Sequence, residues 1–365
     1  MKNKNYLIPL LSILALIAFV FIFTKVVIYL IIAAVVSLLA QPLVNLYSKI
    51  RYKNHNLPNG VLSLLALFTV LFSIVGLIYA IFPTLITEIQ FLSTLNFNNV
   101  FSDIINQFPT LKKTLSNFGT EKEISENIIN QMEKLFNLEN IGQMLNSFIS
   151  ILGSILGGTL AVLFISFFFL KEKGMVYKMI ILITPTKYEE NTADIIRNSR
   201  NLLSKYFVGL SIDILIVSLT VSLSMYFAGI KNAFIIGIFT GLMNVIPYLG
   251  PFISLIFASV LGVTGCIEFQ QLQEIGPTLT KIVIILASVN LLDAFILQPY
   301  IFSNTVKAHP LEIFLVIMMA ASLVGIWGMV IAIPTYTFLR IVAKEFLTHL
   351  KFFKKITDSI SDPNP

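Results

Sequence analysis

The chain has 365 residues, of which 56% are hydrophobic and only 12% charged, and its mean hydropathy is +0.86. A soluble domain carries roughly 25% charged residues, so the composition excludes an ordinary soluble globular protein. The formal net charge is +6, but the Lys and Arg residues fall in short loops between apolar segments and form no basic stripe with interleaved aromatic residues. The lipid bilayer is therefore the expected partner, and nucleic acid is not.

Apolar stretches long enough to cross a membrane recur along the chain. About 20 apolar residues at 1.5 Å rise cross a hydrocarbon core of about 30 Å. The first stretch follows Lys2 and Lys4 as in a signal peptide, but no small-residue cleavage site comes after it, and we interpret it as a retained helix. The predicted full spans are residues 7–23, 26–44, 60–82, 148–170, 207–228 and 278–297.

Basic residues set the expected orientation, because short cytoplasmic loops carry an excess of Lys and Arg. Lys2 and Lys4 place the N-terminus in the cytoplasm, and the basic loops at 49–53 and 171–205 alternate consistently with that start. The tail after residue 343 is basic as well. We therefore expect both termini in the cytoplasm.

Two further apolar stretches are interrupted. Residues 231–266 are broken between Pro247 and Pro251, and residues 311–343 are broken between Gly325 and Gly328. The charge pattern requires each stretch to end on the side where it began, so both are expected to form hairpins. Arms of about 13 to 16 residues reach roughly 20 to 24 Å. We predict re-entrant hairpins, one from each side, although arms that nearly span the membrane fit the same pattern.

The fold class that follows is an all-α polytopic membrane protein with about six full transmembrane helices, two broken or re-entrant helical hairpins and a small helical extracytoplasmic insertion. Apolar residues at three-four spacing predict helices in the insertion and in an amphipathic segment along the inner membrane surface. The expected segments are the N-terminal transmembrane helices at 1–83, the insertion at 84–147, a transmembrane core at 148–345 that contains the amphipathic helix 187–206, and a cytoplasmic tail at 346–365.

Metal and cofactor chemistry have no support in the sequence. Cys266 is the single cysteine, and His55, His309 and His349 show no spacing typical of a zinc or haem site. No phosphate-binding loop ending in Gly-Lys-Ser/Thr is present, and neither are the His-Glu-x-x-His or Gly-x-Ser-Gly patterns of hydrolases. We expect no cofactor, no metal and no enzymatic activity.

Few polar groups lie within the predicted spans. An ionisable group at the bilayer centre costs about 2.5 to 3.5 kcal/mol, so a retained one indicates a pathway or a partner. Structural alternatives stay open: Asp213 could pair with Lys205, Asp293 could be a helix-end group, and Asn244 could be a cap. The candidate pathway residues are Asp213, Asn244, Asn290, Asp293 and Gln298.

The residues that break the hairpins are candidates for a hinge. Proline blocks helix continuation and glycine accepts positive φ, so freed carbonyls and a helix N-terminus could face a solute there; a turn without a ligand is the alternative. The pairs Gly153/Gly157 and Gly237/Gly241 predict close helix packing, or an oligomer face. The candidate hinge residues are Pro247, Tyr248, Gly250, Pro251, Gly325, Gly328 and Pro334.

Three motifs follow one another in the second half. They are Asn244-Val-Ile-Pro-Tyr-Leu-Gly-Pro-Phe-Ile-Ser254, then Gln298-Pro-Tyr-Ile-Phe302 with His309-Pro-Leu-Glu-Ile-Phe314, then the glycine-rich turn from Gly325 with Ala332-Ile-Pro-Thr-Tyr336. With them the chain resembles the autoinducer-2 exporter family of permeases, over its full length in layout and over 205–345 in motif.

The resemblance implies a secondary transporter in the inner (plasma) membrane of a bacterium, and by analogy a homo-oligomer such as a pentamer. Members are linked to export of autoinducer-2 or to exchange of Na+ or Li+ for H+. We expect a permease that exports a small polar solute, with autoinducer-2 as one candidate. A Na+(Li+)/H+ antiporter that binds a monovalent cation, and a non-transporting membrane scaffold, are the alternatives.

Overall fold

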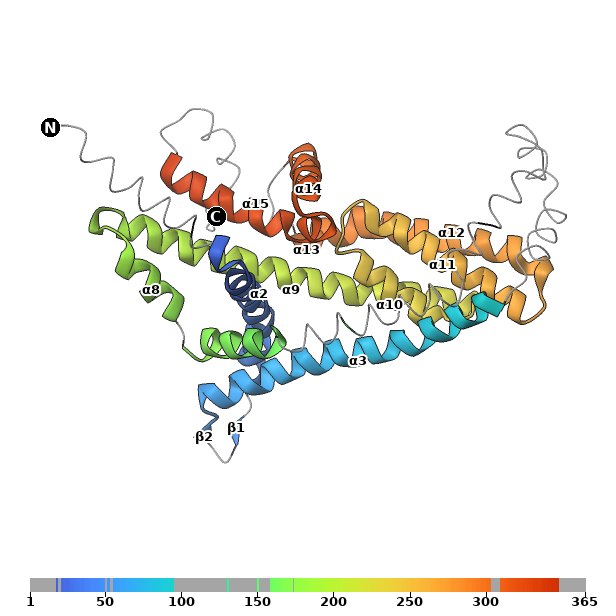
Figure 1. Ribbon diagram of the computed structural model, residues 1–365, viewed down its shortest axis with the longest axis horizontal. Helices are drawn as coiled ribbons and strands as arrows, with labels where there is room; N and C mark the ends of the chain where they lie inside the picture. The colour runs from blue at the N-terminus through green and yellow to red at the C-terminus, as the bar shows by residue number, and fades with distance from the viewer. Residues whose placement is uncertain are drawn as a thin grey trace. The chain divides into compact units, whose positions relative to one another are not determined.

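The fold is almost entirely helical (Figure 1). The computed structural model describes residues 18, 21–49, 51–52, 55–94, 130, 150, 158–172, 174–302 and 309–347. Two compact units can be separated, residues 1–73 with 150–200 and residues 74–149 with 201–365. Five described helices are long and apolar enough to cross a membrane, namely Thr24–Tyr47, Asn59–Thr94, Thr186–Phe227, Leu249–Glu268 and Leu272–Ile301. The expected all-α polytopic fold is thereby confirmed.

The first unit packs its helices around small and branched apolar residues. Its elements are α2 (Thr24–Tyr47), β1 (Arg51–Tyr52), β2 (His55–Asn56), the start of α3 (Asn59–Thr94), the helix Gly158–Lys171, α8 (Met175–Ile183), η1 (Thr186–Tyr188) and the start of α9 (Glu189–Phe227). β1 and β2 pair antiparallel between α2 and α3, with Arg51 opposite Asn56 and Tyr52 opposite His55. The core consists of Ala40, Val44, Leu62, Ala66, Leu67 and Leu170.

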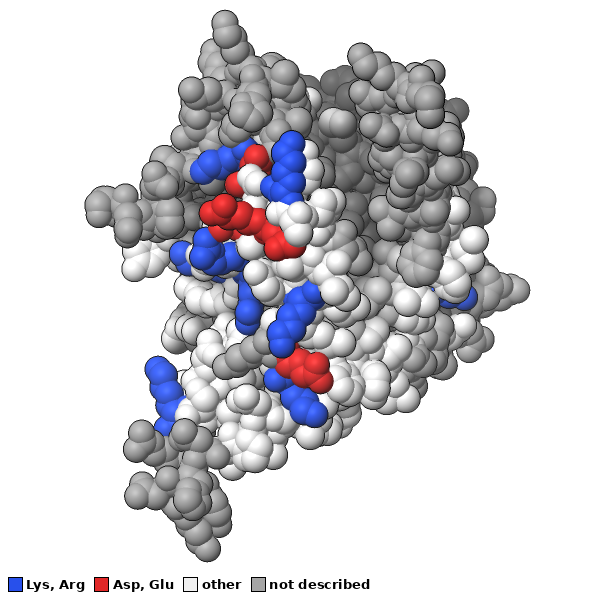
Figure 2. Space-filling view, turned by 90° about the vertical axis from the view of Figure 1, so that its left-hand side faces the viewer, with Lys and Arg blue, Asp and Glu red and all other residues white. Residues whose placement is uncertain are grey.

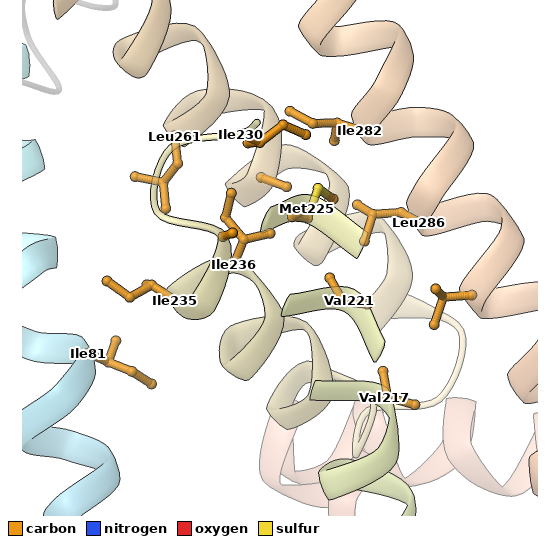
Figure 3. Packing of buried hydrophobic residues seen from close by; sticks show 13 residues of the cluster. Ile81, Val217, Val221, Met225, Ile230, Ile235, Ile236, Leu261, Ile282 and Leu286 are labelled. Atoms are coloured by element: carbon orange, nitrogen blue, oxygen red, sulfur yellow. The ribbon is translucent and has the colours of Figure 1, made fainter. Parts of the chain in front are cut away.

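The second unit continues from the later parts of α3 and α9. Its further elements are α10 (Ala233–Met243), α11 (Leu249–Glu268), η2 (Leu272–Glu274), α12 (Ile275–Leu292), the π-helical turn η3 (Asp293–Leu297), α13 (Gln298–Phe302), α14 (Pro310–Val324) and α15 (Ile326–Leu347). Its core lies among α9, α10, α11 and α12, with Ile81 added from α3, as Figure 3 shows. The innermost side chains include Val217, Val221, Met225, Ile236, Ile282 and Leu286.

Apolar side chains also cover much of the outer surface, which is the expected result when lipid is the solvent. Charged side chains interrupt this largely uncharged surface, as the blue and red residues in Figure 2 show, and one group of them belongs to the start of α9. The exposed charged residues of that segment include Lys187, Glu190, Arg197 and Arg200. Ile195 and Ser199 on the same turns are buried, so this part of α9 is amphipathic, as predicted.

Small residues let α10 pack directly against α9. A Cβ atom at Gly237 would overlap Ser222, and one at Gly241 would overlap Ser218. The pair Gly237/Gly241 therefore serves helix packing within the chain. Gly153 and Gly157 lie outside the described residues.

Both interrupted stretches form helical hairpins. The first consists of α10 and α11, which are separated by residues 244–248, and the rings of Phe239 and Phe257 stack across it at 3.8 Å between centroids. The second consists of α14 and α15, which meet at Gly325 with φ +65°. The expectation of arms of similar length is wrong, because α10 and α14 have 11 and 15 residues whereas α11 and α15 have 20 and 22.

Several predicted boundaries are displaced. The predicted segments 187–206 and 207–228 belong to one continuous helix, α9, and no turn separates the amphipathic part from the span. No proline lies between them, and the helix continues through the glycine at residue 209. α3 runs through Pro83 to Thr94, beyond the predicted end at 82. Pro334, a candidate hinge residue, lies inside α15 and does not end it. The span 7–23, apart from its last residues, and most of the insertion 84–147 lie outside the described residues.

Replacing Gly241 by Leu should lower the thermal stability of the protein in detergent. The new side chain would overlap Ser218 and the carbonyl of Ile214 on α9, and overpacking of this kind costs about 1 to 3 kcal/mol. Thermal unfolding followed by size-exclusion chromatography measures the change. Gly76→Leu is the matched control, because a Cβ at Gly76 meets no atom within 4 Å, and an equal loss in both variants would contradict the close α9–α10 packing.

Candidate functional site

Four of the predicted pathway residues meet in the second unit. The Asn244 side chain donates from Nδ2 to Asp213 Oδ2 at 2.8 Å and to Asp293 Oδ2 at 3.0 Å. Gln298 donates from Nε2 to the same Asp293 oxygen at 2.9 Å. The two protons of the Asn244 amide are thus sufficient to bridge both carboxylates. We call Asp213, Asn244, Asp293 and Gln298 the carboxylate cluster.

Each member of the carboxylate cluster comes from a different element. Asp213 lies on α9, Asn244 follows the last residue of α10, Asp293 begins the π-helical turn, and Gln298 begins α13. Because the backbone pieces are helical and fixed by the core, the side chains need little further ordering to meet.

The π-helical turn explains how Gln298 reaches Asp293. Pro299 has no backbone N–H, and just before it the helix widens over Asp293–Leu297, with the N–H of Gln298 bonded to the carbonyl of Asp293. In such a turn residues five apart lie above one another. An ordinary α-helix would turn the Gln298 side chain away from Asp293.

The break in the first hairpin places Asn244. Asn244 has helical dihedral angles at the C-terminal end of α10, and the chain reverses at Tyr248, which has φ +66° and ψ −44°. The N–H of Leu249 donates to the carbonyl of Pro247 at 2.8 Å, which closes a three-residue γ-turn of the strained type. Gly250 then passes so close to the carbonyl of Met243 that no Cβ would fit there.

The two carboxylates of the cluster are buried, whereas Asn244 is half-buried and Gln298 is exposed. Asp213 is 2% exposed and Asp293 is 3% exposed. One oxygen on each, Oδ1, is buried and has no hydrogen-bond partner among the described residues. Buried polar groups normally have partners, and buried carboxylates are normally paired with a cation. The donors that the described part of the chain supplies here are the neutral amides of Asn244 and Gln298.

No described cation neutralises the cluster. Lys205, the alternative partner considered for Asp213, makes no ion pair with it in the part of the chain that the structure describes. The interpretation of Asp293 as a half-exposed helix-end group is wrong, since it is buried. The free Oδ1 atoms are acceptors that a proton, a cation or a donor group on a solute could occupy.

Asn290 does not join the carboxylate cluster. It is half-buried on α12, and among the described residues its side chain makes no hydrogen bond with the other four candidates. Of the hinge candidates, Tyr248 is half exposed and packs edge-on against Phe314 at 5.4 Å between centroids. The tip of the first hairpin therefore contacts α14 of the second.

One polar contact of the second hairpin was not predicted. Tyr336 Oη donates to Glu312 Oε2 at 2.7 Å and ties α15 to α14. His309 caps α14, and its Nδ1 accepts from the N–H of Leu311 at 3.2 Å. Glu312 and Tyr336 both lie in the sequence motifs described above, and those motifs were the feature of the sequence that could have indicated this contact. The hydrogen bond shows that the motifs help to assemble the second hairpin.

The helices, the two broken hairpins and the buried polar centre define a multi-pass membrane transporter. A family model described as "AI-2E family transporter" matches residues 10–348. The chain belongs to the AI-2E transporter family, and the resemblance noted from its motifs is confirmed.

Two relatives agree with this assignment. The chain is 29% identical over 268 residues, 71% of this chain and 69% of the relative, to the Bacillus subtilis protein named "Putative transport protein YueF". It is 23% identical over 354 residues, 95% of this chain and 98% of the relative, to a Thermotoga maritima protein named "Putative transport protein". The similarity to the Thermotoga maritima protein extends over almost the full length of both chains.

Asn244→Ala should destabilise the protein. It removes the amide that bridges two buried carboxylates, and an unsatisfied buried polar group costs about 1 to 3 kcal/mol. Asp213→Asn should instead preserve or raise stability, because it leaves one buried charge in place of two. Thermal unfolding in detergent measures both, with Asn290→Ala as the control. A lower unfolding temperature for Asp213→Asn than for Asn244→Ala would contradict the assigned geometry.

Proposed function

We propose that this transporter is a secondary exporter of a small polar solute, with autoinducer-2 as a candidate cargo, and that the carboxylate cluster lines its path. The observation that carries the proposal is the pair of buried carboxylates with unpartnered Oδ1 atoms beside the break between α10 and α11. Broken helices in secondary transporters place such groups near the bilayer midplane, where substrates and coupling ions bind. A solute with several hydroxyl groups would donate to those oxygens.

We further propose that both termini lie in the cytoplasm of a bacterial cell and that the two hairpins are re-entrant from opposite sides. The basic loops support this orientation. The arms α10 and α14, at about 16 and 22 Å, are shorter than a full crossing, whereas α11 and α15, at about 30 and 33 Å, reach that length. In this arrangement residues 148–345 form the transport core and residues 84–147 an external cap. A homo-oligomer, with a pentamer as the expected size, is proposed from the family alone.

A second function, exchange of Na+ or Li+ for H+, is favoured by the same carboxylates. Asp213 and Asp293 face the neutral amides of Asn244 and Gln298 and no described cation, so a monovalent cation and a proton could occupy the free oxygens in turn. The two functions differ in what crosses the membrane: the exporter moves an organic solute, and the antiporter moves only ions.

Asp213→Asn and Asp293→Asn should each lower transport at least about tenfold, the effect of losing an interaction of about 1.4 kcal/mol. The assay uses the full chain in proteoliposomes, with release of labelled autoinducer-2 or another small polyol under a pH or Na+ gradient. Asn290→Ala is the control and should retain activity, because Asn290 is outside the carboxylate cluster. Wild-type rates in both aspartate variants would exclude the cluster from the path.

A pH-sensitive dye inside the same vesicles separates the two functions. Addition of Na+ or Li+ without organic solute should leave the dye signal of the exporter unchanged, and an antiporter should change it in the wild type and not in the Asp213→Asn/Asp293→Asn double variant. A protein that moves neither solute nor ions under any imposed gradient would instead fit the membrane scaffold.

A further inference from the structure

A second polar cluster lies at the opposite end of the first hairpin. Lys231 precedes α10, and its Nζ lies 3.3 Å from Glu88 Oε1 on α3 and pairs also with Glu268 at the end of α11. Asn232 donates from Nδ2 to the same Glu88 oxygen at 2.6 Å. The Lys231–Glu88 ion pair thus connects α3 to the base of the hairpin, where α10 begins and α11 ends.

The members of this cluster differ in exposure. The Glu88 side chain is 5% exposed, that of Lys231 is 26% exposed, and that of Glu268 is 41% exposed. Glu88 Oε2 is buried without a hydrogen-bond partner among the described residues. Glu88 therefore depends on Lys231 and Asn232 for compensation of its charge, because an unpaired buried carboxylate is costly.

The rest of the Lys231 side chain is closely packed. Its Cβ and Cδ lie 2.9 and 3.3 Å from the position that a Cβ would take on Gly265 of α11, and its Nζ lies 5.9 Å from the centre of the Phe269 ring. Only a glycine at 265 leaves room for the lysine stem. The geometry fixes Lys231 between α3 and α11 rather than leaving it in solvent.

The short helix α10 connects this cluster to the carboxylate cluster. Asn232, in the left-handed conformation, precedes its first residue, and Asn244 follows its last. With 11 residues α10 is about 16 Å long, and a helix of that length moves as a rigid body. Displacement of the base of the hairpin would therefore carry Asn244 away from Asp213 and Asp293.

We propose that Glu88, Lys231 and Glu268 form a latch that holds the base of the α10–α11 hairpin against α3, and that the latch must open before the carboxylate cluster is accessible from that side. Lys231 is then a positioning residue for transport, since it contacts no solute itself. The inference rests on the proposed function, which places the solute path at the carboxylate cluster.

The chain contains its own reporter for the latch. Cys266 is the single cysteine of the sequence, lies two residues before Glu268, and is 7% exposed. Its Sγ lies 3.5 Å from Thr278 Oγ1 on α12. A closed hairpin base keeps this thiol from water, and an open base would expose it.

The experiment measures the rate at which a membrane-impermeant methanethiosulfonate labels Cys266 in the full-length protein in proteoliposomes. Glu88→Gln and Lys231→Met should each raise the rate at least about tenfold, since each removes one side of a partly buried ion pair. Gly265→Leu should raise it as well, by displacing the Lys231 stem without a change of charge. Lys281→Met is the matched control, because the Lys281 Nζ bonds only the Ala228 carbonyl, at 3.4 Å, among the described residues.

Labelling at the wild-type rate in Glu88→Gln and Lys231→Met would overturn the latch, and so would equal acceleration in Lys281→Met. Glu268→Gln, at the exposed partner, should give a smaller increase and provides a folded variant if the others prove unstable. Because labelling needs no solute, faster labelling together with unaltered transport in Asp213→Asn and Asp293→Asn would support the latch and reject the proposed function separately.

Discussion

The second unit is organised around one amide that serves two buried carboxylates. Asn244 can reach Asp213 and Asp293 together only if α9, α10 and the turn after α12 approach one another closely. The helix packing is consistent with that close approach: serines on α9 lie against glycines on α10, and buried apolar residues of both helices belong to one core. A polar centre that few donors satisfy thereby fixes the geometry of the helices around it.

The sequence was sufficient to find the polar centre but not to assemble it. Asp213 and Asp293 stood out because charges are rare in apolar spans, and Asn244 because it precedes a proline-rich break. Their contact joins residues 31 and 49 positions apart, and depends on helix packing that no local pattern contains. Asn290, three residues before Asp293, was a candidate for the same path, but the π-helical turn pairs Asp293 with Gln298 instead.

Helix lengths were the second feature that the sequence patterns did not predict correctly. The prolines and glycines of the sequence located both hairpin breaks correctly. The turns with positive φ, at Tyr248 and at Gly325, lie within the predicted intervals Pro247–Pro251 and Gly325–Gly328. They did not predict which breaks the packing would tolerate, so α15 passes through Pro334 and α3 through Pro83. Glu88 was assigned to an external insertion because apolar length ended at residue 82; its helix continues, which brings it to Lys231.

The γ-turn at Tyr248 places backbone strain at the tip of the first hairpin. A residue other than glycine at positive φ carries strain of about 1 to 3 kcal/mol, here offset by the neighbouring contacts, including the Tyr248 ring against Phe314. Under the proposed function, a solute or cation bound at the free Oδ1 atoms would compete with Asn244 for the two carboxylates and would weaken one restraint on the tip. Binding at the carboxylate cluster would then release mechanical energy already present in the backbone, and the ligand would not have to supply all of the work of rearranging the hairpin.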